Sequence, residues 1–203
     1  MAKERLKSPR ARLFIALDLP ERMRASLVEW GERELHDPAL RLVSGQSLHV
    51  TLAFLGFRPE REVPRLAEIL AASERRTVRL ELRDPVARPE RGRPRLFALP
   101  AISADAEKLQ AELQERLVKE GLYKPEKRPF WPHITVARVR PEERGSRRPK
   151  AVSRPPGRLP KELLQPADAI RASLYRSELK PQGALYTPLA QVELSGSDGS
   201  EVI

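Results

Sequence analysis

The chain has 203 residues and a mass of 23.0 kDa, and its 40% hydrophobic and 33% charged residues are typical of a folded globular protein. It has no cysteine, which excludes disulfides, thiolate metal sites and cysteine nucleophiles. It also has no apolar run of the roughly 18 residues that a membrane-spanning helix needs, and no signal peptide at its N-terminus, so we expect a cytoplasmic protein with no membrane contact.

The formal net charge is +10, from 29 Arg and 9 Lys against 28 Asp and Glu. Because the planar guanidinium binds phosphate well, this balance favours a polyanionic partner, although an Arg-rich codon bias would give the same composition. Residues 138–161 hold nine cations and two anions, a net +7, within a Pro-rich stretch. We therefore expect this stretch to guide a polyanionic partner.

The first half of the chain predicts the order strand, helix, strand, helix, strand. A short apolar run ended by Pro20 indicates a buried strand, and the spacing of Met23, Leu27 and Trp30 indicates a helix after it. Gly56 is expected to end the second strand. The predicted ranges are 12–18, 21–36, 48–55, 63–70 and 78–82.

The second half repeats this order. A strand over 96–99 precedes a helix with Ser103 as its N-cap and Gly121 as its stop signal. Further strands are predicted over 132–139, 170–174 and 185–194. We expect residues 1–11 to be a flexible basic N-terminus and residues 195–203 a disordered tail. Residues 12–194 would form one catalytic domain, with a basic Pro-rich loop at 140–161.

A short segment recurs in the two halves. The sequence His49-Val-Thr-Leu-Ala matches His133-Ile-Thr-Val-Ala at an offset of 84, and Phe14, Ala16 and Leu17 match residues 97–99. This agreement favours a duplication. The predicted fold is α+β, with two pseudo-symmetric lobes that share a cleft and each bring one histidine to it.

The two His-x-Thr motifs are the strongest functional signal. The chain has only three His and four Thr, so a chance origin of both motifs is on the order of one in a thousand. In a strand, residues i and i+2 share a face, so each imidazole projects beside a hydroxyl. His49 and His133 can act as acid and base on a phosphodiester while Thr51 and Thr135 bind its oxygens, and no metal or other cofactor is then required.

Other interpretations of these histidines have less support. A metal site would need a third ligand, and neither a His-Glu-x-x-His pattern nor clustered carboxylates appear near the two motifs. No Gly-x-Ser-x-Gly elbow or Gly-rich phosphate loop is present. His36, next to Asp37, is expected to be solvated.

Several neighbours of the motifs are secondary candidates. Arg138 lies five residues after His133, an odd offset that turns it away from the site unless the strand bulges or ends. Phe54 holds the equivalent place in the first half, where packing in the core is favoured over stacking on a base. Trp131 is a second candidate for base stacking, as are Phe130 and Tyr186.

The segments SLHVTLAFLG, PFWPHITVAR and LYRSELKPQGALY resemble those of the RNA 2′,3′-cyclic phosphodiesterases, formerly called 2′-5′ RNA ligases, of the two-histidine phosphoesterase superfamily. The resemblance covers about residues 12–194. It implies two antiparallel sheets with outer helices around a central groove. It also implies hydrolysis of a terminal 2′,3′-cyclic phosphate to a 2′-phosphomonoester, and reversible ATP-independent joining of tRNA halves through a 2′-5′ linkage.

The same resemblance implies roles for individual residues. His49 would be the proton donor and His133 the proton acceptor, with Thr51, Thr135 and Arg138 binding the phosphate. The chain differs from the family in its long basic stretch and in having Trp131 where smaller or polar residues are common. We expect a monomer. Alternatives are a noncatalytic protein that binds RNA ends, or a phosphodiesterase acting on 2′-5′ oligonucleotides or small cyclic nucleotides.

Overall fold

The computed structural model describes residues 9–73, 76–180 and 183–194. The elements predicted from periodicity form close to their expected ranges. They are β1 (Arg10–Asp18), α1 (Glu21–Glu34), β3 (His49–Pro59), α2 (Val63–Ala71), β4 (Arg79–Leu82), β6 (Leu96–Ile102), α3 (Ala104–Lys119), β7 (His133–Val139), β9 (Arg171–Lys180) and β10 (Gly183–Glu193). Short elements without a periodic signal add β2 (Leu40–Leu42), β5 (Val86–Arg88), β8 (Ala167–Asp168) and 3-10 turns at Gly45–Ser47, Glu60–Glu62 and Lys161–Leu164.

Several strands extend beyond their predicted ranges. Strand β6 continues to Ile102 instead of ending at 99, and β9 continues to Lys180 instead of ending at 174. Strand β1 begins at Arg10, and Ala11 is already buried, so these residues belong to the sheet and not to a flexible N-terminus. Strand β3 continues past Gly56, which has φ +69° beside a register shift and bends the strand without ending it. Residues 1–8 and the predicted tail at 195–203 lie outside the described residues.

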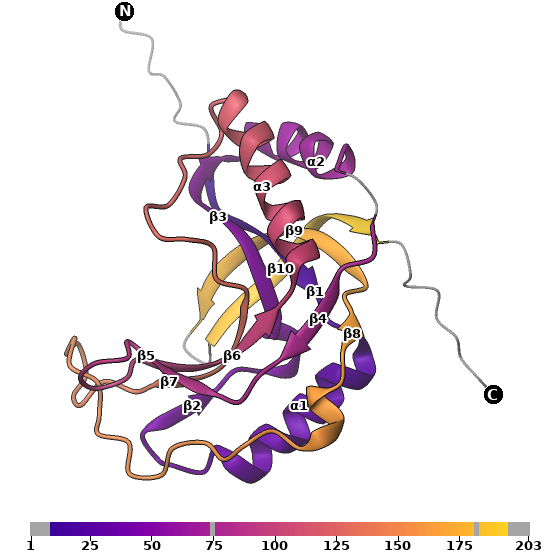
Figure 1. The fold of residues 1–203 in the computed structure, drawn as a ribbon. Coiled ribbons are helices and arrows are strands. Elements are labelled where there is room, and N and C mark those ends of the chain that lie inside the picture. Colours follow the sequence, from indigo (N-terminus) through magenta and orange to yellow (C-terminus); the bar gives the residue numbers. More distant parts are fainter. Residues whose placement is uncertain (1–8, 74–75, 181–182, 195–203) are drawn as a thin grey trace, which may run out of the picture.

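The helices bury the stripes that predicted them. Met23, Leu27 and Trp30 of α1 are buried. The Ser103 hydroxyl caps α3 by accepting the backbone N–H of Ala106 at 3.0 Å. Helix α2 packs against α3 and against the strands β9 and β10 (Figure 1).

The strands form a mostly antiparallel α+β fold, as predicted. The order is β10-β9-β1-β3-β7-β6-β4-β8, with β2 paired to β7 and β5 to β6. The path joins two groups of strands, β10-β9-β1-β3 and β7-β6-β4-β8, and these groups pair at a single pair of residues, Val50 on β3 and Ile134 on β7. These are the middle residues of the two His-x-Thr motifs, so the predicted pair of sheets is one continuous path that is joined at the site.

The register of the two halves confirms their correspondence. In the first half β1 places Asp18, Leu17 and Ala16 opposite residues 49, 50 and 51. In the second half β6 places residues 100, 99 and 98 opposite 133, 134 and 135. Each motif strand then has an extra residue directly after its motif, Leu52 in β3 and Val136 in β7, and these two bulges are again 84 residues apart. Strand β3 has a second bulge at Leu55, next to Gly56.

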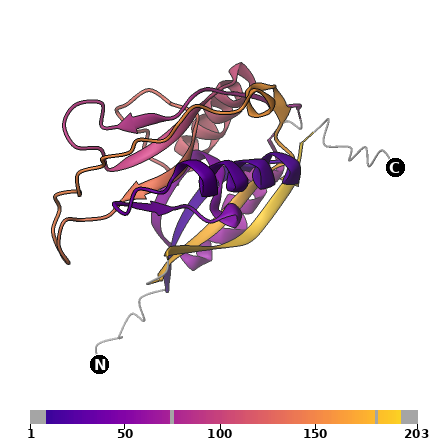
Figure 2. The ribbon, with the colours of Figure 1, turned by 90° about the horizontal axis from the view of Figure 1, so that it is seen from below.

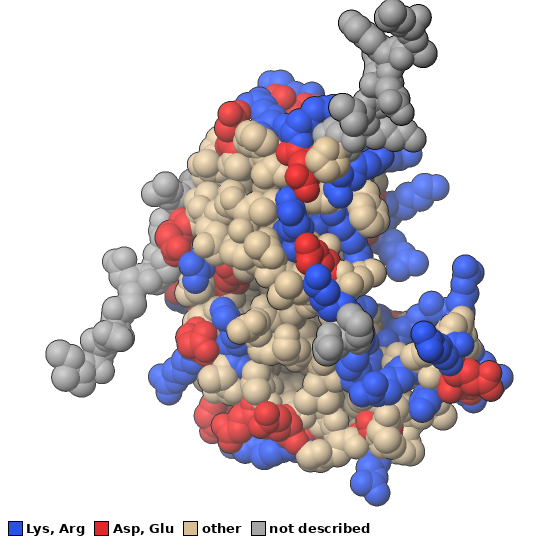
Figure 3. All heavy atoms as spheres, turned by 180° about the vertical axis from the view of Figure 1, so that it is seen from behind, with Lys and Arg blue, Asp and Glu red and all other residues tan. Residues whose placement is uncertain are grey.

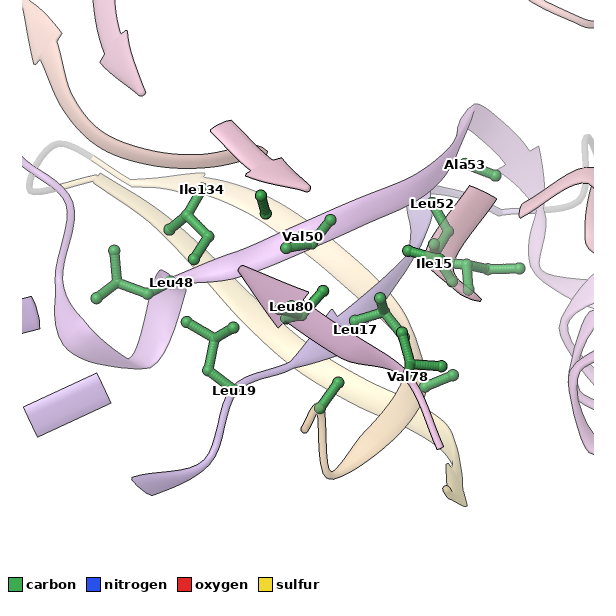
Figure 4. Packing of buried hydrophobic residues seen from close by; sticks show 14 of the residues in the cluster. Ile15, Leu17, Leu19, Leu48, Val50, Leu52, Ala53, Val78, Leu80 and Ile134 are labelled. Atoms are coloured by element: carbon green, nitrogen blue, oxygen red, sulfur yellow. The ribbon is translucent and has the colours of Figure 1, made fainter. Parts of the chain in front are cut away.

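One cluster of apolar side chains lies on the face of β3 and β7 that points away from the histidines. Figure 4 shows Val50 and Ile134 close to Leu48, with Leu17 and Leu80 in the same cluster. Burial of alternate residues on this face leaves residues 49, 51, 133 and 135 on the opposite face.

Candidate active site

The two imidazoles are held in the same way. The Nδ1–H of His49 donates to the carbonyl oxygen of Ser47 at 2.8 Å, and the Nδ1–H of His133 donates to the carbonyl oxygen of Trp131 at 2.7 Å. A carbonyl oxygen only accepts, so both Nδ1 atoms carry hydrogen and the neutral rings have a lone pair on Nε2. Both rings are thus fixed by the backbone two residues before them.

His49 lies in an aromatic surrounding. Its ring centroid is 5.0 Å from that of Phe14 and 5.3 Å from that of Tyr186. The Thr51 hydroxyl lies 3.1 Å from Nε2 and donates to it. The pKa of His49 is lowered to about 4, chiefly by burial and also by the charges of His133 and Arg138, against the opposing effect of the Ser47 carbonyl. His49 is therefore neutral at pH 7.

His133 is covered on one face by an indole. The rings of Trp131 and His133 stack at 4.1 Å with an interplanar angle of 15°, and the guanidinium of Arg88 lies 4.3 Å from the Trp131 ring on the same stack. The pKa of His133 is lowered, first by burial and then by Arg88 and Arg138. Trp131 thus faces the histidine, and it is not among the residues that line the groove.

The bulges decide where the candidate neighbours lie. With Leu52 and Val136 as extra residues, Phe54 and Arg138 return to the face of the histidines. Phe54 is 53% exposed, so the expectation that it packs in the core is wrong. Arg138 is exposed on the same face. The bulge at Val136 brings it there in spite of its odd offset from His133.

A groove of about 1160 Å³ brings these side chains together. Its walls include all the predicted catalytic and phosphate-binding residues and, of the stacking candidates, Phe54 and Tyr186 but not Trp131 or Phe130. The shared set is His49, Thr51, Phe54, His133, Thr135 and Arg138.

A family model described as the 2′-5′ RNA ligase superfamily matches residues 19–176, which span both motifs. The chain belongs to this superfamily. A protein of Thermus thermophilus named RNA 2′,3′-cyclic phosphodiesterase is 37% identical over 205 residues, covering 94% of this chain and 93% of the relative.

Solved structures of similar proteins agree with this membership in the 2′-5′ RNA ligase superfamily. A crystal structure of a protein from Thermus thermophilus has 33% identity and a TM-score of 0.74, covering 90% of this chain and 97% of that chain. Escherichia coli LigT complexed with NADP+ has 27% identity and a TM-score of 0.68, covering 92% of this chain and 99% of that chain.

Arg41 is a groove residue that was not predicted from the sequence. It lines the groove from β2, directly opposite Arg138 on β7. A strand of three residues has no detectable periodicity, so only its basic character near the first motif could have marked it. His36, as expected, is exposed and does not line the groove.

Asp37 was also missed, because the sequence gives no sign of its partners. It is buried, and its carboxylate accepts the backbone N–H groups of Ala39, Ser153 and Arg154 and the Ser153 hydroxyl at 2.7 to 2.9 Å. These hydrogen bonds lower its pKa to about 2. They tie the basic stretch to the end of α1.

The described part of the chain shows no sign of a metal centre or a membrane-spanning helix. It contains no group of three or more His, Cys, Asp or Glu side chains that could hold a metal ion. None of its helices is long and apolar enough to cross a membrane.

Proposed function

We propose that this chain hydrolyses the 2′,3′-cyclic phosphate at the end of an RNA to a 2′-phosphomonoester. The observation that carries the proposal is the pair of imidazoles, each bound to the backbone through Nδ1 and joined across the groove by the Val50–Ile134 pair. Membership in the 2′-5′ RNA ligase superfamily and relatives named RNA 2′,3′-cyclic phosphodiesterase support the same reaction.

In the proposed step His133 is the base. Its Nε2 takes a proton from water, the water oxygen bonds to phosphorus, and the bond from phosphorus to the 3′ oxygen breaks. His49 gives the proton on its Nε2 to the departing 3′ oxygen, so that the phosphate remains on the 2′ oxygen. The same step with a ribose 5′-hydroxyl in place of water would join tRNA halves through a 2′-5′ linkage without ATP, and its reversal would cleave that linkage.

The donor role requires His49 to gain a proton, because it is neutral in the free protein. The negative charge of a bound phosphate favours the imidazolium form and supplies the driving force. Protonated Nε2 no longer accepts from Thr51, so the Thr51 hydroxyl is released to donate to a phosphate oxygen. Protonation of His49 and binding of the phosphate are thus coupled.

The remaining groove residues would hold the substrate. Thr51 and Thr135 bind the nonbridging oxygens, and Arg138 offsets their charge. Phe54 has an exposed face on which the terminal base can stack. Trp131 faces His133, and we assign it to positioning and not to base stacking.

RNA is the proposed partner, and the basic stretch is proposed as its guide. We further propose a monomeric cytoplasmic enzyme in which residues 12–194 form one bilobal catalytic domain. The loop at 140–161 extends from the body of the protein beside β5, as both ribbon views show (Figure 1 and Figure 2), and Arg93 ties the two segments by pairing with Glu142.

Incubation with nucleoside 2′,3′-cyclic phosphates and a short RNA with the same end, in EDTA, tests the proposal. We expect a 2′-phosphate product that persists in chelator. His49→Ala and His133→Ala should each lower kcat by at least about 100-fold, since each removes an acid or base, while circular dichroism shows an intact fold. Binding without turnover would favour the noncatalytic RNA-end-binding protein, and cleavage of 2′-5′ oligonucleotides alone would change the substrate.

A further inference from the structure

A second, smaller hollow lies next to the groove. Its volume is about 390 Å³, and its wall is shared with the groove through the side chains of Arg41 and Arg138. Five cations line it against two carboxylates. The cations are Arg41, Arg138, Arg140, Arg144 and Lys150.

The carboxylates do not neutralise these cations. Glu142 is bound from outside the hollow by Arg93 and Arg148. Glu143 has no ion pair with a lining cation within the described residues. Figure 3 shows the resulting concentration of Lys and Arg on this side of the molecule, over β5 and the loop after β7. With five cations against two carboxylates, one of which is paired outside the hollow, the lining keeps a net positive charge.

The wall shared by the hollow and the groove consists of two like-charged side chains, those of Arg41 and Arg138. Arg41 and Arg138 are direct partners in the antiparallel register of β2 and β7, so their side chains leave the same face of the sheet. Like charges in this position repel, and neither guanidinium has a carboxylate partner in the described part of the chain. An anion between them would remove the repulsion.

Arg140 shows how the rest of the hollow is fixed. Its Nε donates to the carbonyl oxygen of Leu40 at 3.1 Å, and its backbone N–H donates to Ala39. The backbone N–H of Lys150 in turn donates to the carbonyl oxygen of Arg140. These bonds hold the basic loop against β2, so the hollow keeps its shape without a ligand.

We propose that this hollow is a second phosphate subsite, in which Arg41, next to the Arg138 that serves the reactive phosphate, holds the phosphodiester that precedes the reactive end of an RNA. The inference rests on the proposed function. A cyclic phosphate ends the strand, so the rest of the RNA must leave the groove on one side. The side of Phe54 is aromatic, whereas the side of Arg41 is cationic and open to the second hollow.

The test compares three substrates: uridine 2′,3′-cyclic phosphate, a dinucleotide with the same end, and that dinucleotide with an uncharged methylphosphonate linkage. We expect kcat/KM to be about tenfold higher for the phosphate linkage than for the methylphosphonate, the size of one charge-assisted hydrogen bond. Arg41→Gln should abolish this preference and leave hydrolysis of the mononucleotide within about twofold. Arg147→Gln, an exposed cation of the same loop outside the hollow, should keep the preference.

Equal kcat/KM for the two linkages in the unmodified protein would overturn the subsite, as would a preference that survives in Arg41→Gln. Absence of turnover on all three substrates would instead defeat the proposed function. In that case the subsite is tested separately by measuring the affinity for the two dinucleotides by calorimetry. Weaker binding of the methylphosphonate supports the subsite, and equal affinities refute it.

Discussion

At the scale of single residues, the stack of Arg88, Trp131 and His133 holds the imidazole of His133, the proposed base, through one face of its ring. The indole covers one face of the imidazole and the Trp131 carbonyl holds its Nδ1–H, so one residue sets both the plane and the tautomer of the ring. Only Nε2 is left for the substrate. Trp131 thus acts through His133 and is a positioning residue.

Loss of the indole should therefore change how His133 titrates. Trp131→Ala exposes the ring, so its pKa should rise toward the ordinary value of 6.5, and kcat should fall by about tenfold because the ring gains freedom. Trp131→Phe should restore most of kcat. Phe57→Ala, at an exposed aromatic residue outside the groove, is the control. An unchanged pH profile in Trp131→Ala would show that the stack is only structural.

The lowered pKa values of both histidines predict the pH dependence of the reaction. The step needs one protonated and one neutral imidazole, and above pH 6.5 both are neutral in the free protein. We expect kcat/KM to fall about tenfold per pH unit above this value, whereas kcat should peak at a higher pH because bound phosphate favours the proton. Measurement of both constants from pH 4 to 8 checks this, and a flat kcat/KM from pH 6 to 8 would contradict it.

At the scale of elements, the bulges at Leu52 and Val136 set the composition of the site. Without them, the alternation of a regular strand would send Phe54 and Arg138 into the apolar face. Alternation predicted the four motif side chains correctly for this reason, since they precede the bulge. It failed for Phe54, because a bulge depends on pairing with β1 and leaves no mark in a single strand.

The loop from 140 to 161 is predicted from composition to be basic, but its attachment was not. Its segment at 153–154 is fixed by one carboxylate, that of Asp37. Sequence alone could not pair residues more than 110 positions apart, because nothing local links them. The prediction of a solvated His36 holds, although its neighbour is buried.

Asp37→Ala should release this segment. Three backbone N–H groups and a hydroxyl lose their acceptor, so we expect the free energy of unfolding to fall by about 2 to 3 kcal/mol. The lowered pKa means that this stabilisation is present above the unfolded value of 3.8 and is lost as the pH falls toward about 2. Urea denaturation and limited proteolysis measure the effect. Glu107→Ala, exposed on α3, is the control, and equal loss in both variants would count against the anchor.

At the scale of the whole molecule, a duplication explains why so much of the fold was predictable. The offset of 84 between the motifs also relates the bulges, the backbone acceptors of both Nδ1 atoms and the places of Phe54 and Arg138. The two halves differ at the places of Phe54 and Arg138, because the first residue is aromatic and the second is cationic. The two imidazoles are related by near-symmetry, but one has an aromatic neighbour and the other a cationic one. This difference would orient the proposed substrate, whose two ends are not alike.

The junction at Val50 and Ile134 has a mechanical consequence. The strand group β10-β9-β1-β3 pairs there with the group β7-β6-β4-β8 through one residue pair, and the reactive side chains are the immediate neighbours of that pair in sequence. A point close to a pivot moves least, so a rotation of one strand group against the other would widen the distant rims of the groove while the spacing of the two imidazoles changed little. Long strands of RNA could thus be admitted and released by a motion that does not disturb the chemistry.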